Sequence, residues 1–330
     1  MRPRYRFGKD QDVAFGAMDQ SHGNRVAVIL PCYNEAPAIA SVVAAFRAAL
    51  PDAVVHVFDN ASTDRTADVA RSAGATVVRV AQRGKGNVVR RMFADVEADI
   101  YVMADGDGTY DAGAAPAMIA QLLNDGLDMV VGCRTASGDA AYRAGHRFGN
   151  KALTGTVARI FGDGFTDMLS GYRVMSRRYV KSFPALSKGF EIETELTIHA
   201  LELRAPHGEL GTTYGMRTKG TESKLSTWGD GLRILGTILR LHMLERPMAF
   251  YLTLALTGLF VSLGLGVPVI IEYLQTGLVP RFPTAIAAVG FMIAALLCAA
   301  VAIILDSVVT GRREAKRLVY LGIPATRDKG

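Results

Sequence analysis

The chain has 330 residues, 50% of them hydrophobic, and a mean hydropathy of +0.20. This length permits one large domain and a smaller unit, and the apolar residues are concentrated after residue 247. The net charge of +6 favours an anionic partner such as a phosphorylated substrate or an acidic lipid. The aromatic-rich signatures of RNA-binding modules are absent, which argues against nucleic acid. Residues 1–25 are polar and basic, and we expect them to form a flexible tail with no signal peptide.

Short apolar runs alternate with helical patterns over the first 131 residues. Strands are predicted at Val26–Leu30, Val54–Phe58, Ala75–Val80, Ile100–Met103 and Asp128–Val131. Helices are predicted at Ile39–Leu50, Thr66–Gly74, Asn87–Val96 and Ala114–Asn124. Strands that read as unbroken apolar runs between helices predict an α/β fold with a mostly parallel sheet, covered on both faces.

Polar clusters follow four of these strands. They are Tyr33–Glu35, Asp59–Asn60, Arg83–Asn87 and Asp105–Asp107. In a parallel sheet the carboxyl ends of the strands share one edge, and ligands bind at that edge. The sequence therefore predicts a binding site there.

Two further helices are expected at Asn150–Phe161 and Glu193–Leu203, before a segment with a different character. Trp228–Leu244 carries apolar residues at three- and four-residue steps, with cationic residues elsewhere. This pattern, within a juxtamembrane segment at 226–247, predicts an amphipathic helix lying on an anionic membrane surface. An ordinary helix packed on the domain has a similar periodicity and is the alternative.

Met248–Ile271 and Pro283–Leu305 are each long enough to cross about 30 Å of hydrocarbon, which needs about 20 residues. Their length disfavours a buried soluble pair, and we expect a transmembrane hairpin at 248–305. Basic residues lie on its outer flanks, at Arg240, Arg246, Arg312, Arg313, Lys316 and Arg317. The positive-inside rule then predicts that both termini, including a basic tail at 306–330, are on the cytoplasmic side of the plasma (inner) membrane. Gly258, Gly264 and Gly266 are small enough to permit packing with a second copy, hence a possible homo-oligomer.

Asp105 and Asp107 stand two residues apart, directly after a strand. A divalent cation can take oxygen ligands from such a pair while also holding diphosphate oxygens. Acidic, glycine-rich turns are also common without a metal. A calcium-binding EF-hand is disfavoured, because its loop requires glutamate at the twelfth position, and that position is Pro116 here.

Six motifs occur together in one order along the chain. They are Ile29–Glu35, Phe58–Thr66, Arg83–Asn87, Asp105–Asp107, Ser170–Arg173 and Arg217–Lys224. In order and spacing this set resembles family 2 glycosyltransferases, and within them the dolichol- and polyprenyl-phosphate glycosyltransferase branch. The resemblance spans Val26 to Arg246, and it implies a GT-A fold with a catalytic domain at 26–225.

The resemblance also implies roles for individual residues. Asp105 and Asp107 would hold Mg²⁺ or Mn²⁺ against the donor diphosphate. The chain departs from the family at Asn60, where an acid is frequent, and at Ala61, where glycine is frequent. Thr109 stands where glutamine or another polar residue is frequent. The base and ribose pocket would be lined by Pro31, Tyr33, Glu35 and Asp59, with Arg83, Lys85 and Gly86 nearby.

Displacing a nucleoside diphosphate from a sugar requires stabilisation of the leaving group by a cation and by arginine or lysine. An acceptor phosphate is already an anionic nucleophile, so it requires positioning rather than a strong base, and guanidinium groups suit that task. Candidates are Arg173, Arg217 and Lys224, with Ser223 as a further donor, although solvated surface cations are the alternative. The predicted reaction is inverting transfer from a nucleotide-sugar, UDP favoured over GDP, to polyprenyl phosphate.

Three other functions were weighed against this one. A processive polysaccharide synthase is disfavoured because the single tryptophan, Trp228, lacks the Q-x-x-R-W context. A nicotinamide-dependent oxidoreductase is disfavoured because no G-x-G-x-x-G follows the first strand. A non-catalytic membrane protein that senses nucleotides or lipids stays open, although the paired aspartates argue against it. The identity of the sugar is not readable from the sequence.

Overall fold

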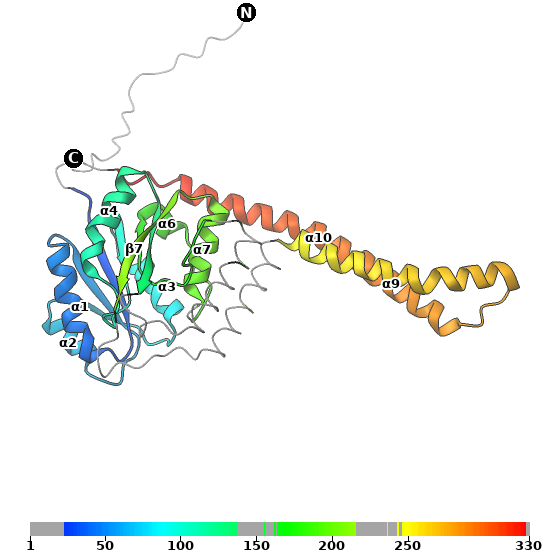
Figure 1. The fold of residues 1–330 in the computed structure, drawn as a ribbon, viewed down its shortest axis with the longest axis horizontal. Coiled ribbons are helices and arrows are strands. Elements are labelled where there is room, and N and C mark those ends of the chain that lie inside the picture. The colour runs from blue at the N-terminus through cyan, green and yellow to red at the C-terminus, as the bar shows by residue number, and fades with distance from the viewer. Residues whose placement is uncertain are drawn as a thin grey trace, which may run out of the picture.

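The computed structural model describes residues 23–136, 164–189, 191–215 and 246–327, with single residues at 155, 162, 236 and 243. Figure 1 shows an α/β domain from which two long helices project as a hairpin. Several predictions fall outside the described residues. These are the roles of Arg217, Ser223 and Lys224. The helices expected at Asn150–Phe161 and Trp228–Leu244 also lie there, apart from residue 155 in the first and residues 236 and 243 in the second.

The domain is built on a seven-stranded sheet with the strand order β3-β2-β1-β4-β6-β5-β7. Neighbouring strands are parallel except around β6, which runs antiparallel to both β4 and β5. The predicted α/β fold with a mostly parallel sheet is therefore confirmed. The strands are β1 (Val26–Cys32), β2 (Val54–Asp59), β3 (Thr76–Arg79), β4 (Ile100–Met103), β5 (Met129–Ala136), β6 (Arg173–Ser176) and β7 (His207–Tyr214).

Helices cover both faces of the sheet. Side chains of a strand alternate between its two faces, so Ile29 and Met103 pack with α3 and α7, whereas Val28 and Val102 pack with α1 and α4. This two-sided burial explains why the strands are apolar at every position. The helices of the domain are α1 (Ala36–Ala49), α2 (Thr66–Ser72), α3 (Lys85–Asp95), α4 (Ala115–Asn124), α6 (Arg177–Ser182) and α7 (Ile192–Leu203), with a 3₁₀ turn at Ala112–Ala114.

The register of the parallel strands brings the predicted polar clusters to one edge. Cys32 of β1 pairs with Asp59 of β2, and Ile29 of β1 pairs with Met103 of β4. The segments that follow β1, β2 and β4 therefore emerge side by side, as the sequence predicts.

The hairpin consists of α9 (Pro247–Thr276) and α10 (Phe282–Leu321), packed through small residues. A Cβ added at Gly258 would lie 3.2 Å from the Cβ of Ala295, so glycine permits this close approach. The Ser262 hydroxyl donates to the Ala288 carbonyl oxygen at 2.7 Å. Gly258 and Gly266 thus face the other helix of the hairpin, whereas Gly264 has open space around it. The homo-oligomer stays a prediction.

Both helices are long and apolar enough to cross a membrane. Only 17% of the most apolar window of each is buried, and Phe260 is 70% exposed. An apolar surface of this extent is stable only when something covers it. The arrangement fits a membrane hairpin and does not fit the buried soluble pair considered above.

α10 continues past the predicted end of its span at Leu305 and returns to the α/β domain. The Tyr320 hydroxyl donates a hydrogen bond to the buried Asp128 carboxylate, and the Arg178 guanidinium lies 4.7 Å from the centre of the Tyr320 ring. Lys316 pairs with Glu202 of α7 at 3.3 Å. Residues 306–321, expected as part of a basic tail, are therefore a docked helix.

We expect Tyr320→Phe to weaken this dock by about 1.5 kcal/mol, because one hydrogen bond to a charged acceptor is lost while Arg178 still pairs with Asp128. Denaturant unfolding of the detergent-solubilised protein measures the change. Tyr273→Phe, at an exposed ring on α9, is the matched control. Equal unfolding free energies for the two variants would contradict the dock.

Candidate active site

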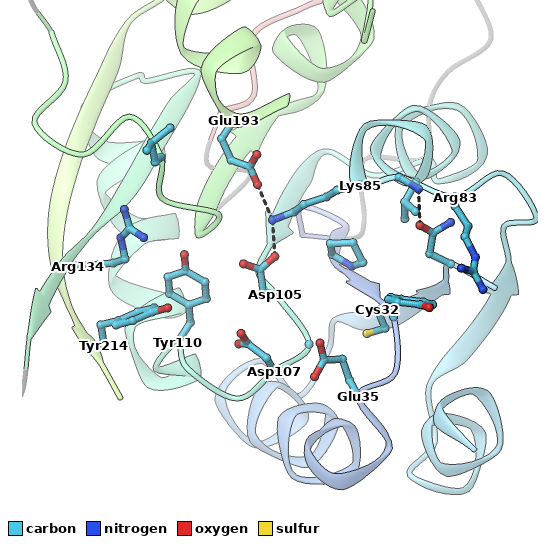
Figure 2. A pocket seen from close by; sticks show the side chains of 17 residues that line it. Cys32, Glu35, Arg83, Lys85, Asp105, Asp107, Tyr110, Arg134, Glu193 and Tyr214 are labelled. Carbon is cyan, nitrogen blue, oxygen red and sulfur yellow. Dashed lines mark hydrogen bonds and ion pairs between the residues drawn. The ribbon is translucent and has the colours of Figure 1, made fainter. Parts of the chain in front are cut away.

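A cavity of about 340 Å³ opens at the carboxyl ends of the parallel strands. Its size is typical of small-molecule sites. Its lining residues come from β1 and from the segments after β1, β2, β3 and β4, together with α3, α7, β5, β7 and Leu169 before β6. Figure 2 shows these side chains around the cavity. The predicted residues that line it are Pro31, Tyr33, Glu35, Arg83, Lys85, Asp105 and Asp107.

The two aspartates project from a tight loop after β4. Gly106 between them is required, because a Cβ there would lie 2.3 Å from the Cys32 sulfur. Thr109 donates to Asp107 Oδ1 from both its backbone nitrogen (3.2 Å) and its hydroxyl (2.6 Å), which orients that carboxylate. Thr109 therefore supports the aspartate.

This donor set fits Mg²⁺ or Mn²⁺. Both are hard cations that bind carboxylate oxygens, and Mg²⁺ typically takes one or two carboxylates and completes its shell with phosphate oxygens and water. In the part of the chain that the structure describes, no group of three or more His, Cys, Asp or Glu side chains could hold a metal. The pair Asp105 and Asp107 therefore suits a metal that arrives with a diphosphate better than a permanently held one.

Lys85 lies between two carboxylates at the centre of the cavity. Its Nζ is 2.5 Å from Asp105 Oδ1 and 2.5 Å from Glu193 Oε1. Burial alone would lower the pKa of Lys85, but the two carboxylates raise it above its ordinary value. Glu193 comes from α7, about a hundred residues further along the chain, so no local sequence pattern places it against Lys85.

The glycines around Lys85 are required by close backbone contacts. A Cβ at Gly84, whose φ is 117°, would lie 2.2 Å from the Lys188 carbonyl oxygen, and one at Gly86 would lie 2.1 Å from that of Ser187. Glu195 of α7 in turn accepts hydrogen bonds from the backbone nitrogens of Leu186 and Ser187, both at 2.8 Å. This loop therefore shapes the glycine-rich segment. Gly86 itself is not among the residues that line the cavity.

Asn60 explains one departure from the family pattern. Its Oδ1 accepts from the Gly84 backbone nitrogen at 2.7 Å, and its Nδ2 donates to the Gln82 carbonyl at 2.7 Å. A carboxylate accepts only, so an amide suits this pair of contacts. Asp59 beside it is buried and outside the cavity wall, so its predicted contact with the nucleotide stays a prediction.

The prediction for Arg173 is wrong. Its side chain is fully buried in β6, where the guanidinium donates to the carbonyl oxygens of Ser170, Met168 and Glu193 and to the Thr197 hydroxyl. A buried cation whose donors are used by the protein is not available to an acceptor phosphate. In the same motif Gly171 is the residue at the site, because a Cβ there would lie 2.9 Å from Asp105 Oδ2.

Arg134, which is not among the predicted site residues, lines the far end of the cavity. Asp167 holds its guanidinium through two hydrogen bonds, Nε to Oδ2 at 2.8 Å and Nη2 to Oδ1 at 2.7 Å. Thr166, the residue before Asp167, is held by Glu209. The Glu209 carboxylate accepts hydrogen bonds from the Thr166 backbone nitrogen at 2.6 Å and from its hydroxyl at 2.7 Å. Arg134 follows the predicted strand Asp128–Val131, so the strand-end rule would have found it once β5 was extended.

The model of the glycosyl transferase family 2 matches residues 27–183. Glycosyltransferase AglJ from Haloferax volcanii is 34% identical over 250 residues, which cover 75% of this chain and 82% of AglJ. The chain belongs to glycosyltransferase family 2. A second relative in Haloferax volcanii, named dolichyl-phosphate hexose transferase, is 28% identical to this glycosyltransferase over 221 residues, 67% of this chain and 95% of its own length.

A solved structure adds the ligands of a neighbour. The glycosyltransferase resembles glucosyl-3-phosphoglycerate synthase from Mycobacterium tuberculosis in complex with Mn²⁺ and UDP-glucose, with a TM-score of 0.52 and 26% identity. The match covers 66% of this chain and 78% of that chain. The GT-A fold is thereby confirmed, and the chain is a glycosyltransferase that uses a nucleotide-sugar donor.

We expect Asp107→Asn to lower sugar transfer by about 10²-fold or more, since a charge that stabilises the leaving group is lost. Thr109 still donates to the amide oxygen, so the unfolding transition stays unchanged. Asp125→Asn, at an exposed carboxylate after α4, is the control. Near-normal turnover of Asp107→Asn at saturating Mn²⁺ and donor would contradict a role for this carboxylate.

Proposed function

We propose that this glycosyltransferase moves a hexose from a nucleotide-sugar to polyprenyl phosphate, with inversion, at the membrane surface. One observation carries the proposal. The cavity has Arg83 at one end, the aspartate pair in the middle and Arg134 at the other end, in a chain with a membrane-type hairpin (Figure 2). It therefore offers separate places for a nucleotide, a diphosphate and a second phosphate.

The nucleotide binds at the end formed by β1 and β2. The Arg83 guanidinium lies 5.2 Å from the centre of the Tyr33 ring, and Pro31 and Glu35 complete this wall. Asp59 and Gly86 do not line the cavity, and we retain them as proposed nucleotide ligands. UDP is the favoured nucleotide, which the UDP-glucose complex of the solved neighbour supports.

Asp105 and Asp107 would hold the divalent cation. When bound, Mg²⁺ or Mn²⁺ neutralises the charge that develops on the departing diphosphate. Lys85 donates to the same oxygens from the other side. The wall of the cavity limits water, which strengthens these interactions relative to solvent.

The acceptor phosphate binds at Arg134. A phosphate is its own nucleophile, so the protein has to bring a second anion beside the diphosphate and offset their repulsion. Asp167 keeps the Arg134 plane fixed, and Tyr110 and Tyr214 form the adjacent wall. Arg217, Ser223 and Lys224 follow β7, whose last residue Tyr214 lines the cavity, and we retain them as further phosphate ligands.

A lipid acceptor is favoured over a soluble one for two reasons. The hairpin holds the catalytic domain next to a bilayer, and a relative over most of the chain is named dolichyl-phosphate hexose transferase. Basic residues outside both apolar spans favour a cytoplasmic location of the domain and of both termini. We divide the chain into the domain at 26–225, the juxtamembrane segment at 226–247 and the hairpin at 248–305.

The proposal is tested by offering labelled UDP- and GDP-hexoses to the purified protein with polyprenyl phosphate, polyprenol or 3-phosphoglycerate. We expect lipid-soluble label with polyprenyl phosphate only, because polyprenol lacks the nucleophilic anion. Transfer to 3-phosphoglycerate at a higher kcat/KM than to polyprenyl phosphate would contradict a lipid acceptor.

We expect Arg134→Lys to raise the KM for polyprenyl phosphate roughly tenfold, because an ammonium cannot keep both hydrogen bonds to Asp167 and still present a planar donor edge. The affinity for UDP, measured by calorimetry, changes by less than about twofold, since the nucleotide binds at the other end of the cavity. Arg79→Lys, at an exposed position on β3, is the control. If the KM for polyprenyl phosphate stays unchanged while UDP binding weakens, Arg134 belongs to the donor site and the proposed acceptor role is wrong.

A further inference from the structure

At the centre of the cavity the Lys85 ammonium pairs with Asp105, a carboxylate that is expected to bind a metal. Lys85 begins α3, Asp105 follows β4, and Glu193 lies in the first turn of α7. Figure 2 shows the ammonium between the two carboxylates. We propose that Lys85 makes metal binding conditional on the donor diphosphate. This inference rests on the donor half of the proposed function and is independent of the acceptor.

Lys85 and an incoming divalent cation compete for one carboxylate, that of Asp105. Lys85 Nζ lies 2.5 Å from Asp105 Oδ1, and the lysine side chain is only 9% exposed. A divalent cation that approaches Asp105 alone meets a fixed positive charge, and at a few ångströms the repulsion is large in a partly dry site. It also has to disturb a buried ion pair, which is costly when no new partner replaces the lost one.

Lys85 is held in place. Gly84 and Gly86 pack against the backbone at 187–188, and the Gly86 nitrogen donates to the Lys188 carbonyl at 3.1 Å. A Cβ on Gly171 would lie 3.2 Å from Lys85 Nζ, so the backbone there closes over the ammonium. The ammonium therefore stays beside Asp105 whether or not a metal is near.

A bound diphosphate changes the effect of Lys85 on metal binding from unfavourable to favourable. Its oxygens ligate the metal and also accept hydrogen bonds from the ammonium, and such charge-assisted bonds are the strong ones. Lys85 then stabilises the complex that it opposed in the empty site. By linkage, the nucleotide must raise metal affinity by the same factor by which the metal raises nucleotide affinity.

Glu193 sets the balance between these two states. Its side chain is 5% exposed, and its Oε1 takes part of the ammonium charge that would otherwise rest on Asp105 alone. Neutralising Glu193 should therefore tighten the hold of Lys85 on Asp105, whereas removing Lys85 should release Asp105. The two variants are predicted to act in opposite directions on the same measurement.

The test measures Mn²⁺ binding by electron paramagnetic resonance, with and without saturating UDP. For Lys85→Met we expect the affinity for Mn²⁺ alone to rise roughly tenfold and the affinity in UDP to fall roughly tenfold, within the usual range of coupling between sites. For Glu193→Gln we expect weaker binding of Mn²⁺ alone. Lys316→Met removes a lysine that is also paired with a carboxylate, at the α10 dock, and should leave both affinities unchanged.

A loss of Mn²⁺ affinity in Lys85→Met that is equal with and without UDP would overturn the proposal, as would no change in either. Thermal unfolding of each variant identifies a folding defect. If Lys85→Met is defective, Glu193→Gln provides the test, and stronger binding of Mn²⁺ alone by Glu193→Gln would overturn the proposal. No acceptor is present, so a failure of polyprenyl phosphate as acceptor leaves this result intact. Absence of Mn²⁺ binding to the wild type with UDP would instead overturn the donor site.

Discussion

The ion pairs of Lys85 with Asp105 and Glu193 join three parts of the chain that are far apart in sequence. They connect the start of α3, the end of β4 and the first turn of α7 through one ammonium. The neighbouring glycines and the loop at 186–188 pack around this ion-paired lysine. A Cβ at Gly171 would contact Asp105 and Lys85, whereas one at Gly84 or Gly86 would collide with the backbone at 187–188, a loop that Glu195 secures. The charge of this group is what a metal and a diphosphate encounter on entering the cavity.

α7 also connects the site with the membrane hairpin. Its first turn carries Glu193 in the cavity, and its last turn carries Glu202, which pairs with Lys316 of α10. α10 runs without interruption from the apolar span to the dock at Asp128 and Tyr320. A helix rises 1.5 Å per residue, so the dock sets the distance between the domain and the apolar span of α10. This geometry is suited to an acceptor whose phosphate lies at the membrane surface.

Much of the fold was predictable because its signals are local. Apolar runs such as Val26–Leu30 and Ile100–Met103 identify strands buried on both faces, and the strand-end rule placed Tyr33, Arg83 and Asp105 on one edge. β6 was missed because it begins with a buried arginine, which no apolar-run search finds. Arg173 was misassigned for the same reason, since the sequence does not show that carbonyl oxygens satisfy its guanidinium.

Other parts depend on partners distant in the chain. The contact between Glu193 and Lys85 and the return of α10 to Asp128 have no signature within a sequence window. Arg134 lay beyond the predicted end of a strand that was read too short. Ala61, at a φ of 55°, takes the left-handed conformation for which family members have glycine, so here the family pattern correctly indicated a backbone requirement.

The central claim is that one cavity brings a donor diphosphate and a lipid phosphate together. Phosphorus relaxation of a short-chain polyprenyl phosphate, recorded with the protein, UDP and Mn²⁺, measures the distance from the metal to the acceptor phosphorus. The account predicts strong paramagnetic relaxation that requires both UDP and the protein and that weakens in Arg134→Lys. Relaxation no greater than that of the lipid with Mn²⁺ and UDP alone would show that the two phosphates do not share this cavity.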